Sequence, residues 1–155
     1  MGTITVRSPR AEDKWPLVDV HVKARRSYYE GHLPEAELAE WERSARARGY
    51  TFDQPDRVWL CAELDGALVG FALVTSSGEL VQLQVDPASW GNGVGRALHD
   101  AAVGSLRDLG VVTAHLDVFA ENHRALRFYR DRGWREVGRT DEAPAHVRMA
   151  LRLPV

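Results

Sequence analysis

The sequence predicts a single domain of mixed α/β class, with a mixed sheet and helices on its faces. Runs in which apolar and polar residues alternate are interspersed with runs of helical spacing, in the order β-α-α-β-β-β-α-β-α-β-β. An Asp65-Gly66 pair joins two β-rich runs and predicts a tight antiparallel hairpin, because both residues tolerate positive φ. The strand, helix and strand between residues 79 and 119 predict a right-handed parallel crossover. With 155 residues, 45% of them hydrophobic, the chain suits one compact domain over residues 1–155.

The first fifty residues predict one strand and two helices. Residues 4–8 alternate between apolar and polar side chains, which is typical of a short strand. Residues 11–29 carry apolar side chains at helical spacing, and Gly31 is placed to end this helix. A second helix begins at Pro34, since proline suits the first turn of a helix, and Gly49 ends it.

The remaining residues predict six strands and two helices. Asn122 is placed to cap the second of these helices, because its side chain can accept a hydrogen bond from an unpaired amide. Gly110 and Gly133 are placed to end the two helices. Two strands flank Asp65-Gly66 within residues 57–76, the others cover 79–85, 111–119, 134–139 and 146–153, and the helices cover 93–110 and 122–133.

Charge and cysteine content narrow the class of protein. The net charge is -2 and the pI is about 6.3, which gives no overall basic footprint for nucleic acid. The single cysteine, Cys61, excludes an internal disulfide and fits a reducing compartment. No run approaches the roughly 20 apolar residues that span a bilayer, and residues 1–15 lack the apolar core of a signal peptide. We therefore expect a cytoplasmic protein without a nucleic-acid or membrane partner. Four arginines cluster locally and predict a solvated helix face: Arg124, Arg127, Arg130 and Arg132.

Three glycines at alternate positions, Gly91, Gly93 and Gly95, lie where the third predicted helix begins. Such a turn presents free backbone N–H groups and the positive end of the helix dipole, which suits a phosphate group. A dinucleotide fingerprint would need glycine where Arg96 stands, and the chain has no Walker A sequence. The glycines alone are equally consistent with a phosphate cradle and with a plain connection.

Two stretches together resemble the motifs of the GCN5-related N-acetyltransferase (GNAT) family. "VDPASWGNGVGRAL" is similar to the glycine motif of the family, with Trp90 in place of the usual Gln or Arg. "LDVFAENHRALRFYRDRGW" is similar to its second motif, in which Asn122, Tyr129, Gly133 and Trp134 match in turn. The resemblance covers nearly the whole chain in element order.

The resemblance implies a GNAT fold, in which the fourth and fifth strands splay apart and acetyl-CoA lies in the gap. The fourth strand would pair with the pantetheine arm through its backbone, and the glycine turn would hold the pyrophosphate. Acetyl-CoA is the expected co-substrate, and no metal is expected. The residues that the resemblance assigns to the cofactor are Leu83, Gln84, Val85, Gly91, Asn92, Gly93, Val94, Gly95, Arg96, Asn122 and Tyr129.

The resemblance also makes Tyr129 the expected general acid. A tyrosine has a pKa of about 10 and a simple thiol one of about 8.5, so the un-ionised hydroxyl can hydrogen-bond the departing sulfur and donate or relay a proton to it. The base is either Glu79, at the head of the fourth strand, or a water chain, for example through Gln82. Ideal pleating puts Glu79 on the face of Val81 and Leu83, although a bulge would re-aim it. A core aromatic and a solvated carboxylate are the alternative roles of Tyr129 and Glu79.

The acceptor site of the family is shaped by the first two helices and by the loop between the last two strands. These segments contain Tyr28, Tyr29, His32 and Glu142. We expect the three rings to line a pocket for a small amine or amino acid, and Glu142 to pair with a cationic acceptor. Aromatic packing on the sheet and a solvated loop are the alternatives.

The expected function is therefore transfer of the acetyl group of acetyl-CoA to a primary amine, by direct attack in a ternary complex. Cys61 has no adjacent histidine and is interpreted as a buried thiol rather than a nucleophile. Transfer of a different acyl group and a non-catalytic acyl-CoA-binding module are the alternatives. Homodimers are common in the family, but the sequence does not show an interface.

Overall fold

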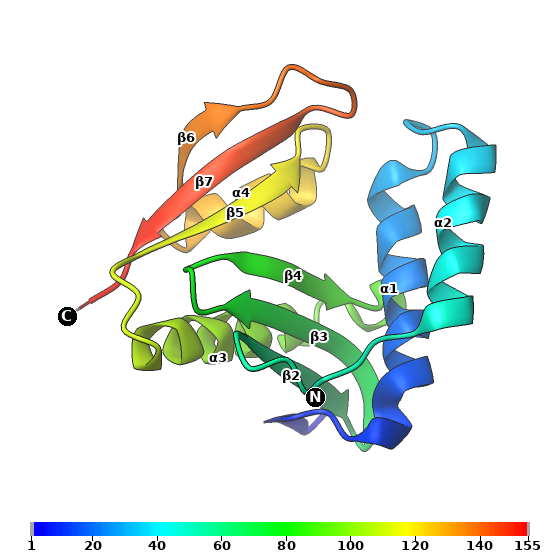
Figure 1. Cartoon of the computed structure of the whole chain (residues 1–155), viewed down its shortest axis with the longest axis horizontal. Coiled ribbons are helices and arrows are strands. Elements are labelled where there is room, and N and C mark those ends of the chain that lie inside the picture. The colour runs from blue at the N-terminus through cyan, green and yellow to red at the C-terminus, as the bar shows by residue number, and fades with distance from the viewer. Residues whose placement is uncertain (1, 155) are drawn as a thin grey trace.

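The computed structural model describes residues 2–154, and its elements follow the predicted order (Figure 1). The predicted domain also includes Met1 and Val155, which lie outside the described residues. No helix within residues 2–154 is long and apolar enough to cross a membrane. The elements are β1 (Ile4–Arg7), α1 (Lys14–Tyr29), α2 (Glu35–Arg48), β2 (Arg57–Leu64), β3 (Ala67–Thr75), β4 (Leu80–Val85), α3 (Val94–Asp108), β5 (Thr113–Phe119), α4 (His123–Asp131), β6 (Arg135–Arg139) and β7 (His146–Arg152).

The strands form two antiparallel sheets rather than one continuous mixed sheet. The first sheet has the order β1-β2-β3-β4 and the second has the order β5-β7-β6. Among the described residues, β4 and β5 are joined only by an isolated parallel bridge between Glu79 and His115. Figure 1 shows the two strands beginning close together and diverging along their length. This divergence is the splay that the family resemblance implied.

Two local backbone features shape the first sheet. The hairpin between β2 and β3 turns through Asp65 at φ 52° and Gly66 at φ 87°, which confirms the predicted turn. In β4, Leu80 pairs with Val74 and Gln82 pairs with Leu73, so the intervening Val81 is an extra residue that forms a bulge. The bulge changes which β4 side chains share a face.

Each face of the first sheet is covered by a helix. On one face α3 packs Leu98 and Leu106 into a core that continues to Met149 of the second sheet. On the other face α1 packs Leu17 against Phe71 of β3. Cys61 lies in this second cluster with no exposed surface, and burial raises the pKa of its thiol to about 11. The position and protonation of Cys61 fit the predicted structural role.

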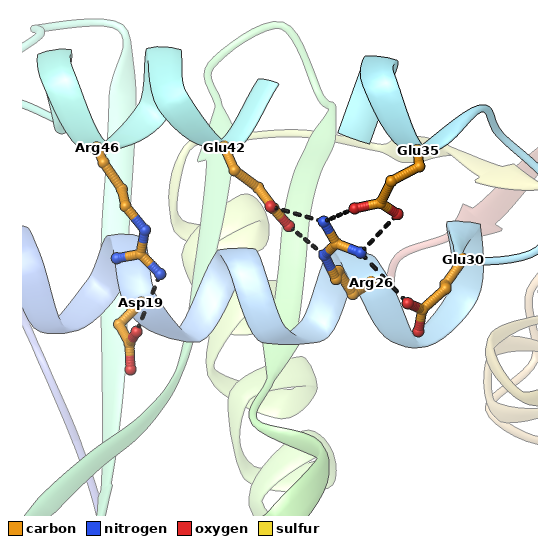
Figure 2. A network of polar contacts seen from close by, with 6 residues as sticks. All are labelled: Asp19, Arg26, Glu30, Glu35, Glu42 and Arg46. Carbon is orange, nitrogen blue, oxygen red and sulfur yellow. Dashed lines mark hydrogen bonds and ion pairs between the residues drawn. The ribbon is translucent and has the colours of Figure 1, made fainter. Parts of the chain in front are cut away.

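A network of ion pairs joins α1 to α2 (Figure 2). The Arg26 guanidinium donates to Glu42 at 2.6 Å, to Glu35 at 2.8 Å and to Glu30 at 3.2 Å. Glu30 follows the last residue of α1 and Glu35 is the first residue of α2, so Arg26 ties together both ends of the connection. The turn at residues 31–34 is thereby held beside the open edge of the sheets.

Candidate active site in the gap between the sheets

The larger of two cavities, about 650 Å³, lies along β4 between the start of α3, the start of α4 and the end of α1. Its lining brings together nearly all the residues that the sequence assigned to a cofactor. The predicted cofactor residues that line it are Leu83, Gln84, Val85, Gly91, Gly93, Val94, Gly95, Arg96, Asn122 and Tyr129. Asn92 does not belong to this lining, because its side-chain amide donates to the Ser89 carbonyl at 2.9 Å and closes the turn.

The glycine turn presents backbone N–H groups to the larger cavity. Gly91 and Gly93 have φ values of 86° and 85°, a conformation that other residues rarely adopt, and Gly93 caps α3. The first helical hydrogen bond runs from the Ala97 N–H to the Gly93 carbonyl at 3.1 Å. The N–H groups of residues 94–96 therefore have no acceptor within α3, and they point out of its N-terminus. A Cβ at Gly91 would meet no protein atom within 4 Å, so the space beside the turn is open for an anionic group.

The edge of β4 offers a second set of backbone groups. The Asp86 N–H donates to the Val69 carbonyl at 2.8 Å, so Asp86 is turned toward β3. Because successive residues of an antiparallel strand alternate in direction, Leu83 and Val85 turn their N–H and C=O groups toward the open edge. This edge can pair with an extended ligand that carries amide groups.

Asn122 combines the two roles that the sequence left open. Its side-chain oxygen accepts a hydrogen bond from the Ala125 N–H at 3.2 Å, which caps α4. The same residue lines both cavities. The cap thus holds the Asn122 amide at the wall of the gap.

Tyr129 lies on α4 with 8% of its surface exposed, and it lines both cavities. Within residues 2–154, the Tyr129 hydroxyl takes part in no hydrogen bond. In the same residues, every side-chain nitrogen or oxygen that is fully buried has a hydrogen-bond partner. The hydroxyl oxygen is therefore not fully enclosed by protein atoms. Burial raises the pKa of Tyr129 above its usual value, which keeps the group protonated at neutral pH.

The smaller cavity, about 250 Å³, lies between β4 and β5. It shares Tyr28, Leu83, Gln84, Asn122, Ala125 and Tyr129 with the larger cavity. Its other polar or aromatic lining residues are Tyr29, Gln82, Asp117, Phe119 and His146. The two cavities therefore meet at a common wall that contains Tyr129.

Hydrogen bonds order the polar side chains of the smaller cavity. The Gln84 amide nitrogen donates to the Tyr28 hydroxyl at 3.2 Å and to the Gln82 side-chain oxygen at 2.9 Å. Burial raises the pKa of Tyr28 to about 12. A second pair joins the Tyr29 hydroxyl to His146 Nε2 at 3.0 Å. No motif in the sequence points to His146, which follows the loop between β6 and β7.

Two predicted acidic site residues lie outside both cavities. Because of the bulge at Val81, Leu80 and not Glu79 shares a face with the Leu83 side chain. The Glu79 carboxylate instead pairs with Arg148 of β7 at 2.5 Å, and this contact raises the pKa of Arg148. Glu142 lies exposed in the loop between β6 and β7, away from both linings.

His32 lies where the sequence predicted it, in the turn between α1 and α2. It lines the larger cavity, and its ring centroid lies 5.4 Å from that of Phe119. The Arg26 network holds the turn on both sides of it. His32 is thus part of the wall near the open end of the gap.

Trp90 and Arg124 form a contact that the sequence did not predict. The Arg124 guanidinium lies 3.7 Å from the centroid of the Trp90 ring, and both residues line the larger cavity. Arg132 lines it too, so two of the four clustered arginines belong to the cavity and not only to a solvated helix face. Trp90 stands where the motif usually has Gln or Arg, and its ring makes a cation–π contact with an arginine from α4.

The two splayed sheets, with a glycine turn at the start of α3, form the architecture that the GNAT resemblance implied. The sequence profile of the Acetyltransferase (GNAT) family matches residues 18–134, and the chain belongs to this family. The match ends before β7, so it includes Tyr129 and the glycine turn but not His146.

Individual relatives and solved structures are similar to parts or all of the chain. A mycothiol acetyltransferase of Beutenbergia cavernae is 38% identical over 94 residues, which cover 57% of this chain and 32% of that protein. An uncharacterized N-acetyltransferase of Mycobacterium tuberculosis is 35% identical over 108 residues, which cover 66% of this chain and 69% of that protein. The structure of the PaiA N-acetyltransferase of Thermoplasma acidophilum in complex with coenzyme A has a TM-score of 0.80 at 20% identity. The similarity covers 97% of this chain and 99% of that one. The chain spans about a third of the length of the mycothiol acetyltransferases that it matches.

Proposed function

We propose that the protein transfers the acetyl group of acetyl-CoA to a primary amine of a small molecule or amino acid, by direct attack in a ternary complex. The observation that carries the proposal is the pair of cavities that meet at Tyr129. One cavity offers an anion cradle and a strand edge, and the other offers polar groups suited to an amine, among them the Asp117 carboxylate. The names of the relatives, mycothiol acetyltransferase and N-acetyltransferase, support the same activity and a small acceptor.

The larger cavity fits coenzyme A. The N–H groups of residues 94–96 and the Arg96 guanidinium would hold the pyrophosphate, and the open space beside Gly91 admits it. Leu83 and Val85 would pair with the amides of the pantetheine arm. Acetyl-CoA supplies an acetyl thioester, whose transfer releases a thiolate.

Tyr129 would protonate that thiolate. Its hydroxyl is not fully enclosed by protein, and a phenol is protonated at neutral pH even before burial raises its pKa. A neutral hydroxyl beside the sulfur can donate its proton as the negative charge develops. The Tyr129 side chain therefore acts as a general acid from the wall between the two cavities.

The amine must lose a proton on the other side of this wall, since a primary amine has a pKa of about 10 and is mainly protonated at neutral pH. Glu79 is paired with Arg148 and lies outside both cavities. The polar side chains of the smaller cavity, including Gln82, line a path for water instead. We therefore favour the water route over direct deprotonation by Glu79.

The test is release of free CoA from acetyl-CoA in the presence of a panel of small amines and amino acids, with mass spectrometry of the products. Transfer to at least one primary amine, with a mass increase of one acetyl group, is the expected result. Tight CoA binding without release on any amine would favour a non-catalytic binding module. Release from a longer acyl-CoA but not from acetyl-CoA would favour a different acyl group.

A further inference from the structure

The smaller cavity contains an imidazole whose tautomer is fixed by its surroundings. His146 Nδ1 lies 2.8 Å from the Pro144 carbonyl oxygen, which can only accept a hydrogen bond. Nδ1 must therefore carry the proton of the neutral ring, and Nε2 carries a lone pair. That lone pair lies 3.0 Å from the Tyr29 hydroxyl, so the hydroxyl donates to it.

The Tyr29 hydroxyl is positioned as a neutral relay. Burial raises the pKa of Tyr29, so the group does not ionise on its own near neutral pH. Its ring is held by Phe119, with centroids 4.8 Å apart, and by the Arg25 guanidinium at 4.9 Å. Tyr29 and His146 both line the smaller cavity, as does Tyr129.

We propose that the Tyr29–His146 pair accepts the proton that the acceptor amine loses, which rests on the proposed acetyl transfer. The N–H bond of the ammonium breaks and its proton passes along the water route to the Tyr29 oxygen, while the Tyr29 proton passes to His146 Nε2. Tyr29 ends neutral and His146 ends as an imidazolium, which then returns the proton to water. No further reactant is needed, and both N–H groups of the imidazolium keep an acceptor, Pro144 and Tyr29.

Charged and titratable groups face this pair from every neighbouring element. These groups are Arg25 and Tyr28 on α1, His32 in the turn before α2, Asp117 on β5, Tyr129 on α4, and Arg148 of β7 with its partner Glu79. Asp117 lines the same cavity and favours a cation there, although it also pairs with Arg148 at 3.3 Å.

The geometry can be tested without any acceptor, by NMR of the protein labelled with ¹⁵N-histidine. At a pH where the ring is neutral, we expect His146 to show the tautomer protonated at Nδ1. The Tyr29→Phe variant should then shift the Nε2 resonance of His146 and leave that of His115 unchanged. A ring protonated at Nε2, or an Nε2 resonance indifferent to Tyr29→Phe, would overturn the proposal.

The chemistry is tested with two acceptors that carry the same benzyl group, 2-phenylethylamine and phenylacetic hydrazide. The first is protonated at neutral pH and needs a base, whereas the terminal nitrogen of the hydrazide is already neutral. We expect His146→Gln to lower turnover on the amine by about 10²-fold at pH 7, with a smaller loss at higher pH. Turnover on the hydrazide should change by much less.

His115→Gln is the matched control, because His115 lies on β5 outside both cavities. Equal losses on both acceptors at every pH would show a structural role for His146 and would overturn the relay. If the unmodified protein acetylates neither acceptor, the proposed function fails for these amines, and the NMR result alone decides the relay.

Discussion

The two cavities that meet at Tyr129 are built in different ways. The larger one draws mainly on two contiguous segments, residues 83–96 and 121–132, both inside the part of the chain that matches the family profile. The smaller one combines Tyr28 and Tyr29 with β4, β5 and His146, which lies beyond that match. The first cavity thus includes a backbone cradle formed by adjacent residues, whereas the second combines side chains from distant segments.

The difference teaches which part of such a site a sequence can specify locally. An anion cradle needs only glycines that adopt positive φ and a helix that follows them, so a few adjacent residues encode it. An arrangement such as Tyr29 with His146 needs α1 and β7 to meet, 117 residues apart in the chain. The first kind of site can be shared by a whole family, whereas the second can differ between members.

The largest effect is expected where the cavities meet. Tyr129→Phe removes the proposed acid without removing the ring, so turnover should fall by about 10² or more while CoA affinity changes little. Steady-state kinetics and calorimetric titration with CoA measure the two effects separately. Tyr50→Phe is the matched control, because its hydroxyl bonds His21 away from both cavities. An unchanged rate for Tyr129→Phe would remove Tyr129 from the mechanism.

On the cofactor side, Gly93→Ala should weaken CoA binding and destabilise the protein. Alanine at a φ of 85° costs about 1–2 kcal/mol in folding and displaces the first N–H groups of α3. Gly104→Ala, within the same helix and with no atom within 4 Å of an added Cβ, should be neutral or slightly stabilising. Thermal unfolding and CoA titration compare the two variants. Equal CoA affinity for both would show that the turn is only a connection.

Arg124→Ala should weaken CoA binding by a smaller factor, about three- to tenfold, because it removes a charge and its stacking on Trp90. The loss should shrink as salt is added, since the charge is at the surface. Arg127→Ala on the same helix does not touch the cavity lining and serves as the control. If both variants bind CoA alike, the contact between Trp90 and Arg124 has no part in cofactor binding.

The smallest effect is expected from Arg26→Gln, which loosens the connection between α1 and α2. The variant should raise the KM for an amine and leave CoA affinity unchanged. Arg26 lowers the pKa of the Glu35 carboxyl in the folded protein. The ion pair therefore stabilises the fold at pH values above the pKa that Glu35 has in the unfolded chain, and this stabilisation is lost as the pH falls through the pKa of the folded state. Thermal unfolding from pH 7 to pH 3 should show a difference between variant and unmodified protein that narrows in acid. A constant difference would mean that Glu35 does not contribute.

The sequence pattern predicted the element order and the Asp65-Gly66 hairpin, the family resemblance implied the splay of β4 and β5, and the structure confirms all three. The resemblance also predicted most of the lining of the larger cavity. The sequence did not predict where the Glu79 side chain lies. The extra residue at Val81 changes which face of β4 the preceding side chains occupy, and the alternation of apolar and polar residues does not reveal this bulge. The sequence did not point to His146 either, since only the pairing of β7 with β5 brings that ring beside Phe119.

The central claim is that coenzyme A enters from the larger cavity and presents its sulfur to Tyr129 at the common wall. A crystal structure of the protein with CoA tests this claim most directly. We predict the pyrophosphate on the N–H groups of residues 94–96 and the sulfur within hydrogen-bonding reach of the Tyr129 hydroxyl. A pyrophosphate held elsewhere, or a sulfur turned away from Tyr129, would contradict it.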